Sequence, residues 1–499
     1  MSGILRTTNH IQPTFAHSRG LFLRLLAVVY FIAFASLTPQ IHALIGADGL
    51  LPAETFFDRA YEIWGLEAYY QLPSLIWLWP NDAFLTLICW FGIVLSIAGI
   101  AGVLPILTFA MLWMCYLSLT IAGQDFLSFQ WDVLLLETGL LAIVYSPNQC
   151  RLTFTTDTEP SKAGRWLIWS LAFKLTFLSG ITKLLSGDET WWNLTALNYH
   201  FETQPIPTWT SWYAHAISDW FGRISVVSMF IIELIVPFVI FVPARYRLVR
   251  AIGCGLLCLL QMLIALTGNY GFFNILTAVL YLALLDDNCI ASVFPRIGTR
   301  TQPRLPKATP IWAQVSIGFI AVVLGTLSML TFFREVRRPE PIPGWSASVL
   351  SWVAPIRSIN GYGLFRSMTT ERREITIEGS IDGQVWTEYP FRWKPGNLSQ
   401  SPRFVQPHMP RLDWQMWFAA LSPEREAHWL FPLVTRLLES PSTVVALLDG
   451  NPFPEENPRF IRLVMYRYHF TGPDPCKSEN WWRREFLGYL TEPISARLN

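Results

Sequence analysis

Six polar side chains lie within or beside long apolar segments, where a charged or strongly polar group is costly and therefore marks a candidate site. Lys174 and Glu233 lie near the middle of two segments that should run in opposite directions, so they could pair at similar depth. In the same way, Asp132 and Lys183 could pair, because both lie near the outer boundary of two neighbouring segments. The set either fixes helix register or forms a pocket for a substrate or lipid headgroup, and comprises Asp132, Glu137, Lys174, Lys183, Glu233 and Gln261.

No pattern in the sequence indicates a catalytic centre, a cofactor or a metal site. His200, Glu202 and His215 could together bind a metal, but their spacing matches no usual helical ligand pair, which favours a surface role. Glycine-rich phosphate loops, nucleophile elbows and paired-carboxylate motifs are not found. Cys476 is alone in the C-terminal region, so that region holds no internal disulfide.

The composition is that of a membrane protein. Hydrophobic residues make up 52% of the 499 residues and charged residues 15%, where about a quarter is usual for charged residues in soluble proteins. The net charge of +1 says nothing about nucleic acid, but the sequence has no basic block suited to phosphate binding, so we expect no nucleic-acid partner. We predict an α-helical bundle of about nine spans within residues 1–333, at 21–37, 83–101, 103–122, 131–147, 166–185, 224–243, 249–267, 271–286 and 312–333.

Lys and Arg are distributed unevenly over the connections between these spans. If the N-terminus is cytoplasmic, twelve of these residues lie on the cytoplasmic side and two on the other side, which favours this orientation. Arg334, Arg337 and Arg338 are a counter-signal, because they follow the last span and would lie on the non-cytoplasmic side. The inner residues are Arg6, Arg19, Arg151, Lys162, Arg165, Arg245, Arg247, Arg250, Arg296, Arg300, Arg304 and Lys307, and the outer ones Arg59 and Arg223.

Two long connections, 38–82 and 186–223, are then non-cytoplasmic. We expect an interfacial helix near residues 66–79 in the first, and a re-entrant or interface-lying cap in the second. An odd number of spans places the region 334–499 in the periplasm or the lumen of a secretory compartment.

In the C-terminal region the hydrophobic period changes from helical to alternating. Residues 374–378 and 385–393 predict two strands, joined by a hairpin turn at Asp382-Gly383, and residues 460–470 predict a central strand. Ser422-Pro423-Glu424 predicts a helix start, and Pro432 should limit that helix. We therefore predict a β-rich α+β soluble domain over residues 334–499.

Tryptophan is abundant, with 23 residues. Those near span ends are typical of interfacial anchors. That explanation does not apply to Trp386, Trp393, Trp414 and Trp417, which are either domain core, the default, or an exposed surface for a client protein.

Four long segments, 124–139, 179–215, 360–393 and 407–421, resemble the lipase maturation factor family. The membrane part is also weakly similar to the horizontally transferred transmembrane domain of vitamin K-dependent carboxylases, but no catalytic lysine motif aligns. The first resemblance implies a multi-pass protein, in eukaryotes of the endoplasmic reticulum membrane, that assists the folding and assembly of secreted lipases. It also implies a C-terminal domain that faces the lumen and contacts the client. In a bacterium the setting would be the inner membrane, and the client need not be a lipase.

Three functions are thus open. The first is a non-enzymatic, membrane-anchored maturation factor whose partners are a secreted client protein and membrane lipid. The second is an integral-membrane enzyme that acts on a lipid or lipid-linked substrate through the six polar residues. The third is transport, for which no inverted repeat is found.

Overall fold

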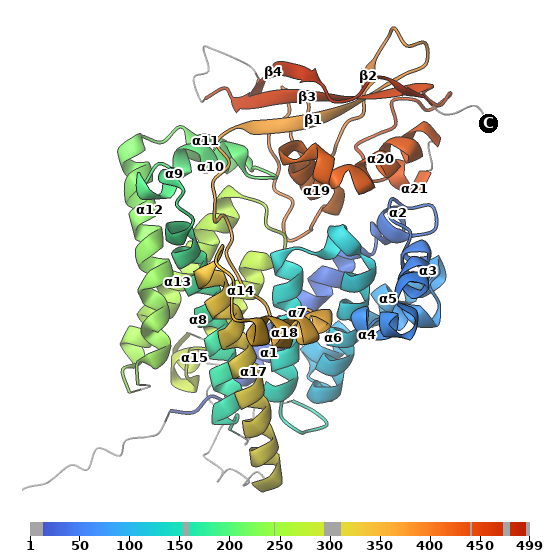
Figure 1. Ribbon diagram of the computed structural model, residues 1–499. Helices are drawn as coiled ribbons and strands as arrows, with labels where there is room; N and C mark the ends of the chain where they lie inside the picture. The colour runs from blue at the N-terminus through green and yellow to red at the C-terminus, as the bar shows by residue number, and fades with distance from the viewer. Residues whose placement is uncertain are drawn as a thin grey trace, which may run out of the picture.

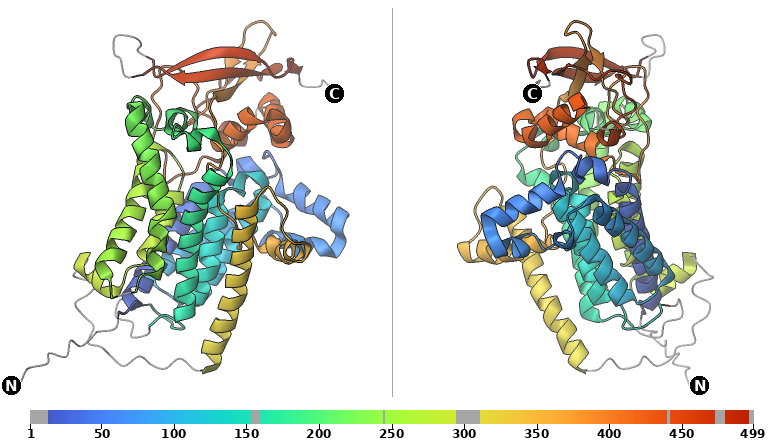
Figure 2. Two further views of the ribbon diagram at one scale, coloured as in Figure 1. Left: turned by 60° about the vertical axis from the view of Figure 1, so that its left-hand side comes forward. Right: turned by 90° about the vertical axis from the view of Figure 1, so that its right-hand side faces the viewer.

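The computed structural model describes residues 13–152, 159–243, 245–293, 311–439, 442–472 and 480–495. Helices stand side by side in the lower part of the molecule, and a sheet closes the opposite end with short helices between (Figures 1 and 2). Several residues used in the sequence interpretation lie outside the described ranges, namely Arg6, Arg296, Arg300, Arg304, Lys307 and Cys476.

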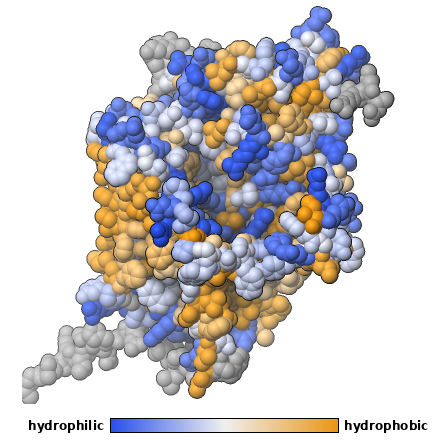
Figure 3. Space-filling view, viewed as in Figure 1, coloured by the Kyte–Doolittle hydropathy of each residue, from blue (hydrophilic) through white to orange (hydrophobic). Residues whose placement is uncertain are grey.

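All nine expected spans are helical, and the chain is an integral membrane protein. Seven helices are long and apolar enough to cross a membrane, and hydrophobic surface covers the outward faces of α12 and α17 (Figure 3). Two further helices, α7 (Gln130–Tyr145) and α14 (Phe273–Leu282), are shorter and lie within the bundle. The seven are α1 (Ala16–Leu37), α5 (Asp82–Ala101), α6 (Pro105–Ala122), α8 (Lys162–Leu185), α12 (Asp219–Leu234) with η4 (Val236–Phe241), α13 (Arg247–Thr267) and α17 (Ile311–Arg337).

The first span is longer than expected because a distant side chain caps it. Asp287, at the start of α15 (Asp287–Val293), accepts hydrogen bonds from the backbone N–H groups of Ala16, His17 and Ser18. These are the N–H groups that a helix leaves without partners in its first turn. A cap 270 residues away cannot be recognised from the local sequence.

The connection between α1 and α5 contains a helix, but earlier than expected. It contains α2 (Ile41–Ile45), α3 (Ala53–Trp64), η1 (Gly65–Glu67), α4 (Ala68–Gln71) and η2 (Leu75–Leu78). Helix α3 forms because Ala53, Phe57 and Ala60 repeat at i, i+4 and i+7 and bury one face. Residues 66–79, expected as the helix, are broken into short turns.

The connection between α8 and α12 folds into short helices that contact the C-terminal region. They are α9 (Glu189–Trp192), α10 (Leu197–Thr203) and α11 (Trp209–His215), and a further turn, η3 (Gln124–Leu127), joins α6 to α7. The carbonyl oxygens of Glu202 and Thr203 accept hydrogen bonds from Arg372 and Trp417. This connection is therefore a cap beneath the sheet rather than a re-entrant segment of the bundle.

The C-terminal sheet has five antiparallel strands in the order β2-β1-β3-β4, with β5 also paired to β3. The predicted central strand is confirmed as β3 (Phe460–Phe470). The other strands are β1 (Arg372–Ser380), β2 (Thr387–Glu388), β4 (Trp482–Tyr489) and β5 (Ile494–Ser495). The helices of this region are α18 (Gly344–Val353), η5 (Ala354–Ile356), α19 (Arg411–Leu421), α20 (Pro423–Glu439) and α21 (Ser442–Val445).

The predicted hairpin is present, but its second strand has only two residues. Residues 381–386 form a wide turn in which the Asp382 carboxylate accepts the N–H groups of Gln384 and Val385. Gly383 takes a φ of 76°, which favours glycine. The side chain of Asp382 thus stabilises a longer turn than a two-residue hairpin, and strand pairing is delayed to Thr387.

Helix α20 does not end at Pro432, and the prediction that it would was wrong. Proline in a helix interior costs about 3 kcal/mol or more. Buried apolar side chains contribute about 1.5–3 kcal/mol each, and those on the inner face of α20 include Trp429, Leu433 and Leu437. Burial of this face outweighs the proline, so the helix continues to Glu439.

Candidate functional site

Asp132 forms a buried ion pair that joins the bundle to the C-terminal region. Arg411, at the start of α19, donates to both its oxygens, at 2.6 Å (Nη1–Oδ2) and 2.8 Å (Nη2–Oδ1). The Tyr116 hydroxyl donates to Oδ1 at 2.5 Å, and Arg411 Nη1 also donates to the Phe126 carbonyl. The expected pairing of Asp132 with Lys183 was wrong. Arg411 lies outside the membrane spans and 279 residues from Asp132 in the sequence, so a comparison of depths within the spans does not reveal this partner.

Glu137 forms the second pair, with Lys174 (Oε1–Nζ 2.5 Å). Its other oxygen accepts the backbone N–H of Asn360 at 3.1 Å and the Tyr362 hydroxyl at 2.6 Å. The expected partner of Lys174, Glu233, instead pairs with Lys183 at 2.7 Å. Helix α12 extends past the end of α8 toward the sheet (Figure 1), so Glu233 reaches the level of Lys183 rather than Lys174.

Residues 360–368, called the strap below, lie against the bundle although they were assigned to the soluble domain. Besides the two contacts with Glu137, the Met368 N–H donates to Asp188 at 2.6 Å, and Trp191 donates to the Phe365 carbonyl at 3.1 Å. A Cβ at Gly361 would overlap the Glu335 side chain, so the strap packs closely on α17 at this glycine. The strap leads from α18 to the sheet.

Gln261 joins none of these pairs through a hydrogen bond found in the described part of the chain, and its buried Oε1 has no partner there. The six polar residues thus form three separate ion pairs and one isolated amide, not a single network. Both carboxylate oxygens of Asp132 and of Glu137 already accept hydrogen bonds from the protein. None of the six residues lines any of the four cavities described for the protein. Their use as a substrate or headgroup site stays a prediction.

Glu202 lies beside His215 and His469 rather than His200. It accepts from His469 Nδ1 at 3.1 Å and from the Phe470 N–H at 2.9 Å, and His215 Nε2 is 3.6 Å away. His200 contacts the Tyr270 hydroxyl instead, and burial lowers the pKa of His200 to about 4. Within the described ranges, no group of three or more His, Cys, Asp or Glu residues could hold a metal ion.

The four tryptophans considered for client contact differ in exposure. Trp414 is 4% exposed and its ring centroid lies 4.7 Å from that of Trp131, so it belongs to the core between bundle and sheet. This burial rules out Trp414 as a surface contact. Trp417 is half-buried and donates to Thr203, and Trp393 is half-buried beside Asp413. Trp386 is half-buried under the Arg462 guanidinium, 4.0 Å from its ring centroid.

An open cavity of about 810 Å³ lies between the N-terminal half of α20 and the β3–β4 side of the sheet. Its lining includes the exposed side chains of Leu421, Phe431, Leu487, Tyr489 and Leu490. We call this surface the sheet-edge groove. The sequence interpretation missed it because no strand was predicted at 482–489. The signal was present, since Phe486-Leu487 and Tyr489 follow two arginines in a short β-prone run.

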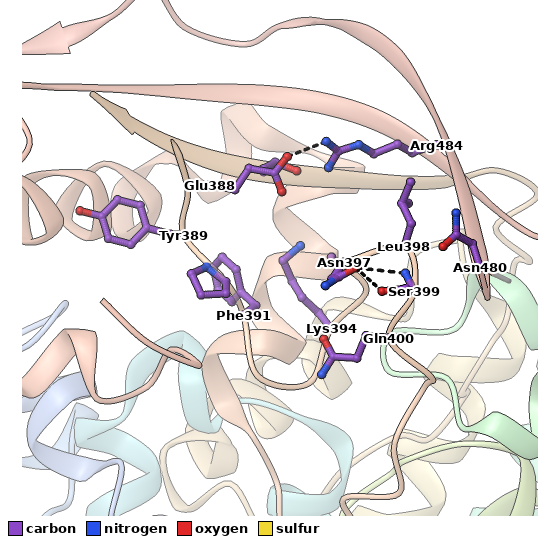
Figure 4. A pocket seen from close by; sticks show the side chains of 13 residues that line it. Glu388, Tyr389, Phe391, Lys394, Asn397, Leu398, Ser399, Gln400, Asn480 and Arg484 are labelled. Carbon is purple, nitrogen blue, oxygen red and sulfur yellow. Dashed lines mark hydrogen bonds and ion pairs between the residues drawn. The ribbon is translucent and has the colours of Figure 1, made fainter. Parts of the chain in front are cut away.

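A second cavity, of about 380 Å³, lies between β2, β4 and residues 394–400 (Figure 4). Glu388 and Arg484 pair across it at 2.6 Å, and Asn397 Oδ1 accepts from the N–H (3.0 Å) and hydroxyl (2.9 Å) of Ser399. Lys394 reaches into it and pairs with Glu374 at 2.9 Å. These charged side chains therefore each have a partner of opposite charge. The polar groups that remain for a ligand in this cavity are mainly amides and hydroxyls.

The comparisons with known proteins match most of the chain. A family model described as "Lipase maturation factor transmembrane domain" matches residues 17–292, and one described as "Lipase maturation factor C-terminal domain" matches residues 358–492. Lipase maturation factor 2 of Gallus gallus is 35% identical, over 96% of this chain and 81% of its own length. The Homo sapiens protein of the same name is 34% identical, over 96% and 82%.

Lipase maturation factor 1 of Mus musculus is 33% identical, over 96% of this chain and 88% of its own length. No solved structure matches the chain. The family-model matches contain the membrane bundle up to α15 and the C-terminal region from the strap onward, whereas α17 and α18 lie between them. The chain therefore belongs to the lipase maturation factor family.

Proposed function

We propose that this protein is a membrane-anchored maturation factor for secreted proteins, with no catalytic step of its own. The names of its relatives make a secreted lipase the first client to test. The excess of Lys and Arg on one side favours a cytoplasmic N-terminus and a C-terminal region in the opposite compartment. In a eukaryotic cell that membrane would be the endoplasmic reticulum, and in a bacterial cell the inner membrane.

The observation that carries this proposal is the sheet-edge groove on the end of the molecule farthest from the bundle (Figure 1). Partly folded proteins expose apolar segments, and a cluster of exposed large apolar side chains, such as the five in this groove, typically marks an interaction site. The groove borders β4, which pairs only with β3 among the described strands. An edge strand offers backbone N–H and C=O groups to an added strand whatever its side chains are. Sequence-tolerant contact of this kind suits a client that must later be released.

Trp386 is the tryptophan candidate that lies near Tyr489 of the groove, although it directly precedes β2 at the other end of the strand order. The Arg462 guanidinium lies 4.0 Å from the Trp386 ring centroid and 4.8 Å from that of Tyr489, so one cation bridges the two aromatic side chains. Trp393 and Trp417 lie elsewhere and are half-buried. We therefore place the client surface on Trp386, Tyr489 and the groove behind them.

The test is coexpression with a secreted lipase. Phe431→Asp and Tyr489→Asp should lower the yield of active secreted lipase while the membrane protein accumulates normally, because a charge in the groove opposes apolar contact. Phe404→Asp is the matched control, since Phe404 is also an exposed apolar residue of the C-terminal region but packs against Trp209 of α11 and does not line the groove. If both groove variants retain full yield, the client surface lies elsewhere.

The enzyme hypothesis has its own readout. A Lys183→Met, Glu233→Gln double variant removes one buried pair together, so the bundle keeps no unpaired charge there. If this variant folds normally but abolishes lipase maturation, and the groove variants do not, the result would support an enzyme that acts through the polar residues of the bundle. The proposed function would then be wrong.

A further inference from the structure

Two segments far apart in the sequence project from the side of the bundle and expose aromatic residues. They are residues 53–79, which contain α3 to η2, and α18 with η5 (Figure 2, right). Their exposed large side chains have between 38% and 77% of their surface accessible. These side chains are Tyr61, Ile63, Trp64, Leu66, Tyr69, Tyr70, Leu78, Trp79, Trp345, Val349 and Trp352.

The two segments are joined to each other and to the bundle. The Tyr70 hydroxyl donates a hydrogen bond to the Trp352 carbonyl. Ser118 on α6 accepts from the Leu75 N–H at 2.9 Å, which ties η2 to a span. Trp113, also on α6, donates to Ser358 at 2.8 Å just after η5. The two segments therefore lie at one level of the bundle and form a single unit, here called the collar.

Few of the large side chains of the collar are buried against the rest of the protein. In α18 only Ser346 and Leu350, one helical turn apart, are buried, while Trp345 and Trp352 are the most exposed tryptophans of the collar. In α3 the buried face consists of small or apolar residues at a helical spacing, and Tyr61, Ile63 and Trp64 lie outside it. A soluble protein would not leave this many large aromatics in water.

We propose that the collar lies in the headgroup region of the membrane leaflet on the side of the C-terminal region, and that phospholipid covers its aromatic face. The collar continues the membrane-exposed surface directly, because η2 ends at Leu78 just before span α5, and α18 begins at Gly344 just after span α17. Trp and Tyr are the side chains that concentrate at the membrane–water interface. Helices with one apolar face lie flat there.

Charge identifies the kind of lipid. The first segment carries Glu54, Asp58, Glu62 and Glu67 against a single Arg59, so it is acidic. Polybasic segments bind anionic lipids, and this segment is the opposite. Its contact with lipid therefore rests on apolar and aromatic burial, it suits zwitterionic phospholipid, and it should not weaken in salt.

The collar also fixes the height of the C-terminal region. The strap leads from η5 toward the sheet, and α19, α20 and the sheet lie on the far side of the collar from the lower ends of the spans (Figure 1). With lipid headgroups at the collar, the sheet-edge groove stands in water above the membrane surface.

Photo-crosslinking of the full chain in phosphatidylcholine nanodiscs tests the proposal. p-Benzoylphenylalanine placed at residue 64, 345 or 352 should capture radiolabelled phosphatidylcholine, and the same probe at residue 385 in the β1–β2 turn should not. The yield should persist in about 1 M salt, where the screening length falls to about 3 Å.

Three outcomes would overturn the proposal. The first is lipid capture at all three collar positions no greater than at residue 385. The second is capture of a protein chain instead of lipid, which would make the collar a protein interface. The third is loss of lipid capture in high salt, which would point to charge recognition. Using three positions guards against one variant that fails to fold.

Discussion

At the residue scale, the three buried carboxylates of the bundle spans each have a different cation as partner. Asp132 contacts Arg411 of the C-terminal region, Glu137 contacts Lys174, and Glu233 contacts Lys183. A buried ion pair adds little net stability over an apolar pair, but a single unpaired charge at the same place is strongly destabilising. These pairs therefore act chiefly by specifying which surfaces dock.

We expect Arg411→Met to destabilise the protein by about 3–5 kcal/mol, because it leaves the Asp132 charge buried and unpaired. The double variant Arg411→Met, Asp132→Leu should lose less than the sum of the two single variants. Unfolding in detergent, followed by tryptophan fluorescence, measures both. Arg373→Met is the control, since Arg373 pairs with Glu371 at the exposed surface, where about 0–1 kcal/mol is typical. Strictly additive losses would contradict the pairing.

At the element scale, long-range contacts decide where several helices begin and end. Helix α20 passes through Pro432 because its inner face is buried, and α1 begins at Ala16 because Asp287 caps it. Helix α20 is also attached to η3 of the bundle by His428, whose Nε2 lies 2.6 Å from Asp125 Oδ2. Burial lowers the pKa of His428, but the hydrogen bond to Asp125 and its charge outweigh burial, so the pKa lies above its ordinary value.

This attachment predicts a pH dependence. A histidine with a raised folded-state pKa stabilises fully below its unfolded value of about 6.5, and its contribution is lost as the pH rises through the folded value. The wild-type protein should therefore exceed His428→Ala in melting temperature at about pH 6, with a smaller difference at about pH 8. The effect should stay below about 1 kcal/mol because the pair is half-exposed. Asp125→Asn should remove it, and parallel pH profiles for all three proteins would refute it.

At the scale of the whole molecule, the bundle and the C-terminal region share one hydrophobic core. Buried residues form one continuous cluster from Phe15 in the bundle to Met465 in the sheet. Aromatic pairs cross the boundary, with ring centroids 4.7 Å apart for Trp131 and Trp414 and 5.8 Å apart for Phe126 and Trp429. Docking of the two parts thus buries Trp414 of α19 and Trp429 of α20.

We expect a fragment of residues 344–499 not to fold by itself. It would expose Trp414 and Trp429 and leave Arg411 without Asp132. Such a fragment should bind the dye ANS and lack near-ultraviolet circular dichroism, which are the signs of lost tertiary packing. The full chain in detergent is the control. Cooperative thermal unfolding of the fragment would show instead that the C-terminal region is an independent domain.

The sequence alone determined the membrane class, the nine helical segments, strand β3 and the family resemblance. Those features rest on the length and period of apolar runs and on contiguous motifs, which are local. Only the tertiary structure decided the partners of Asp132, Glu137, Lys174 and Glu233, the place of the strap against α7 and α8, and the sheet-edge groove. Each of these depends on residues far apart in the chain, whose proximity follows from how helices of different length and height pack together.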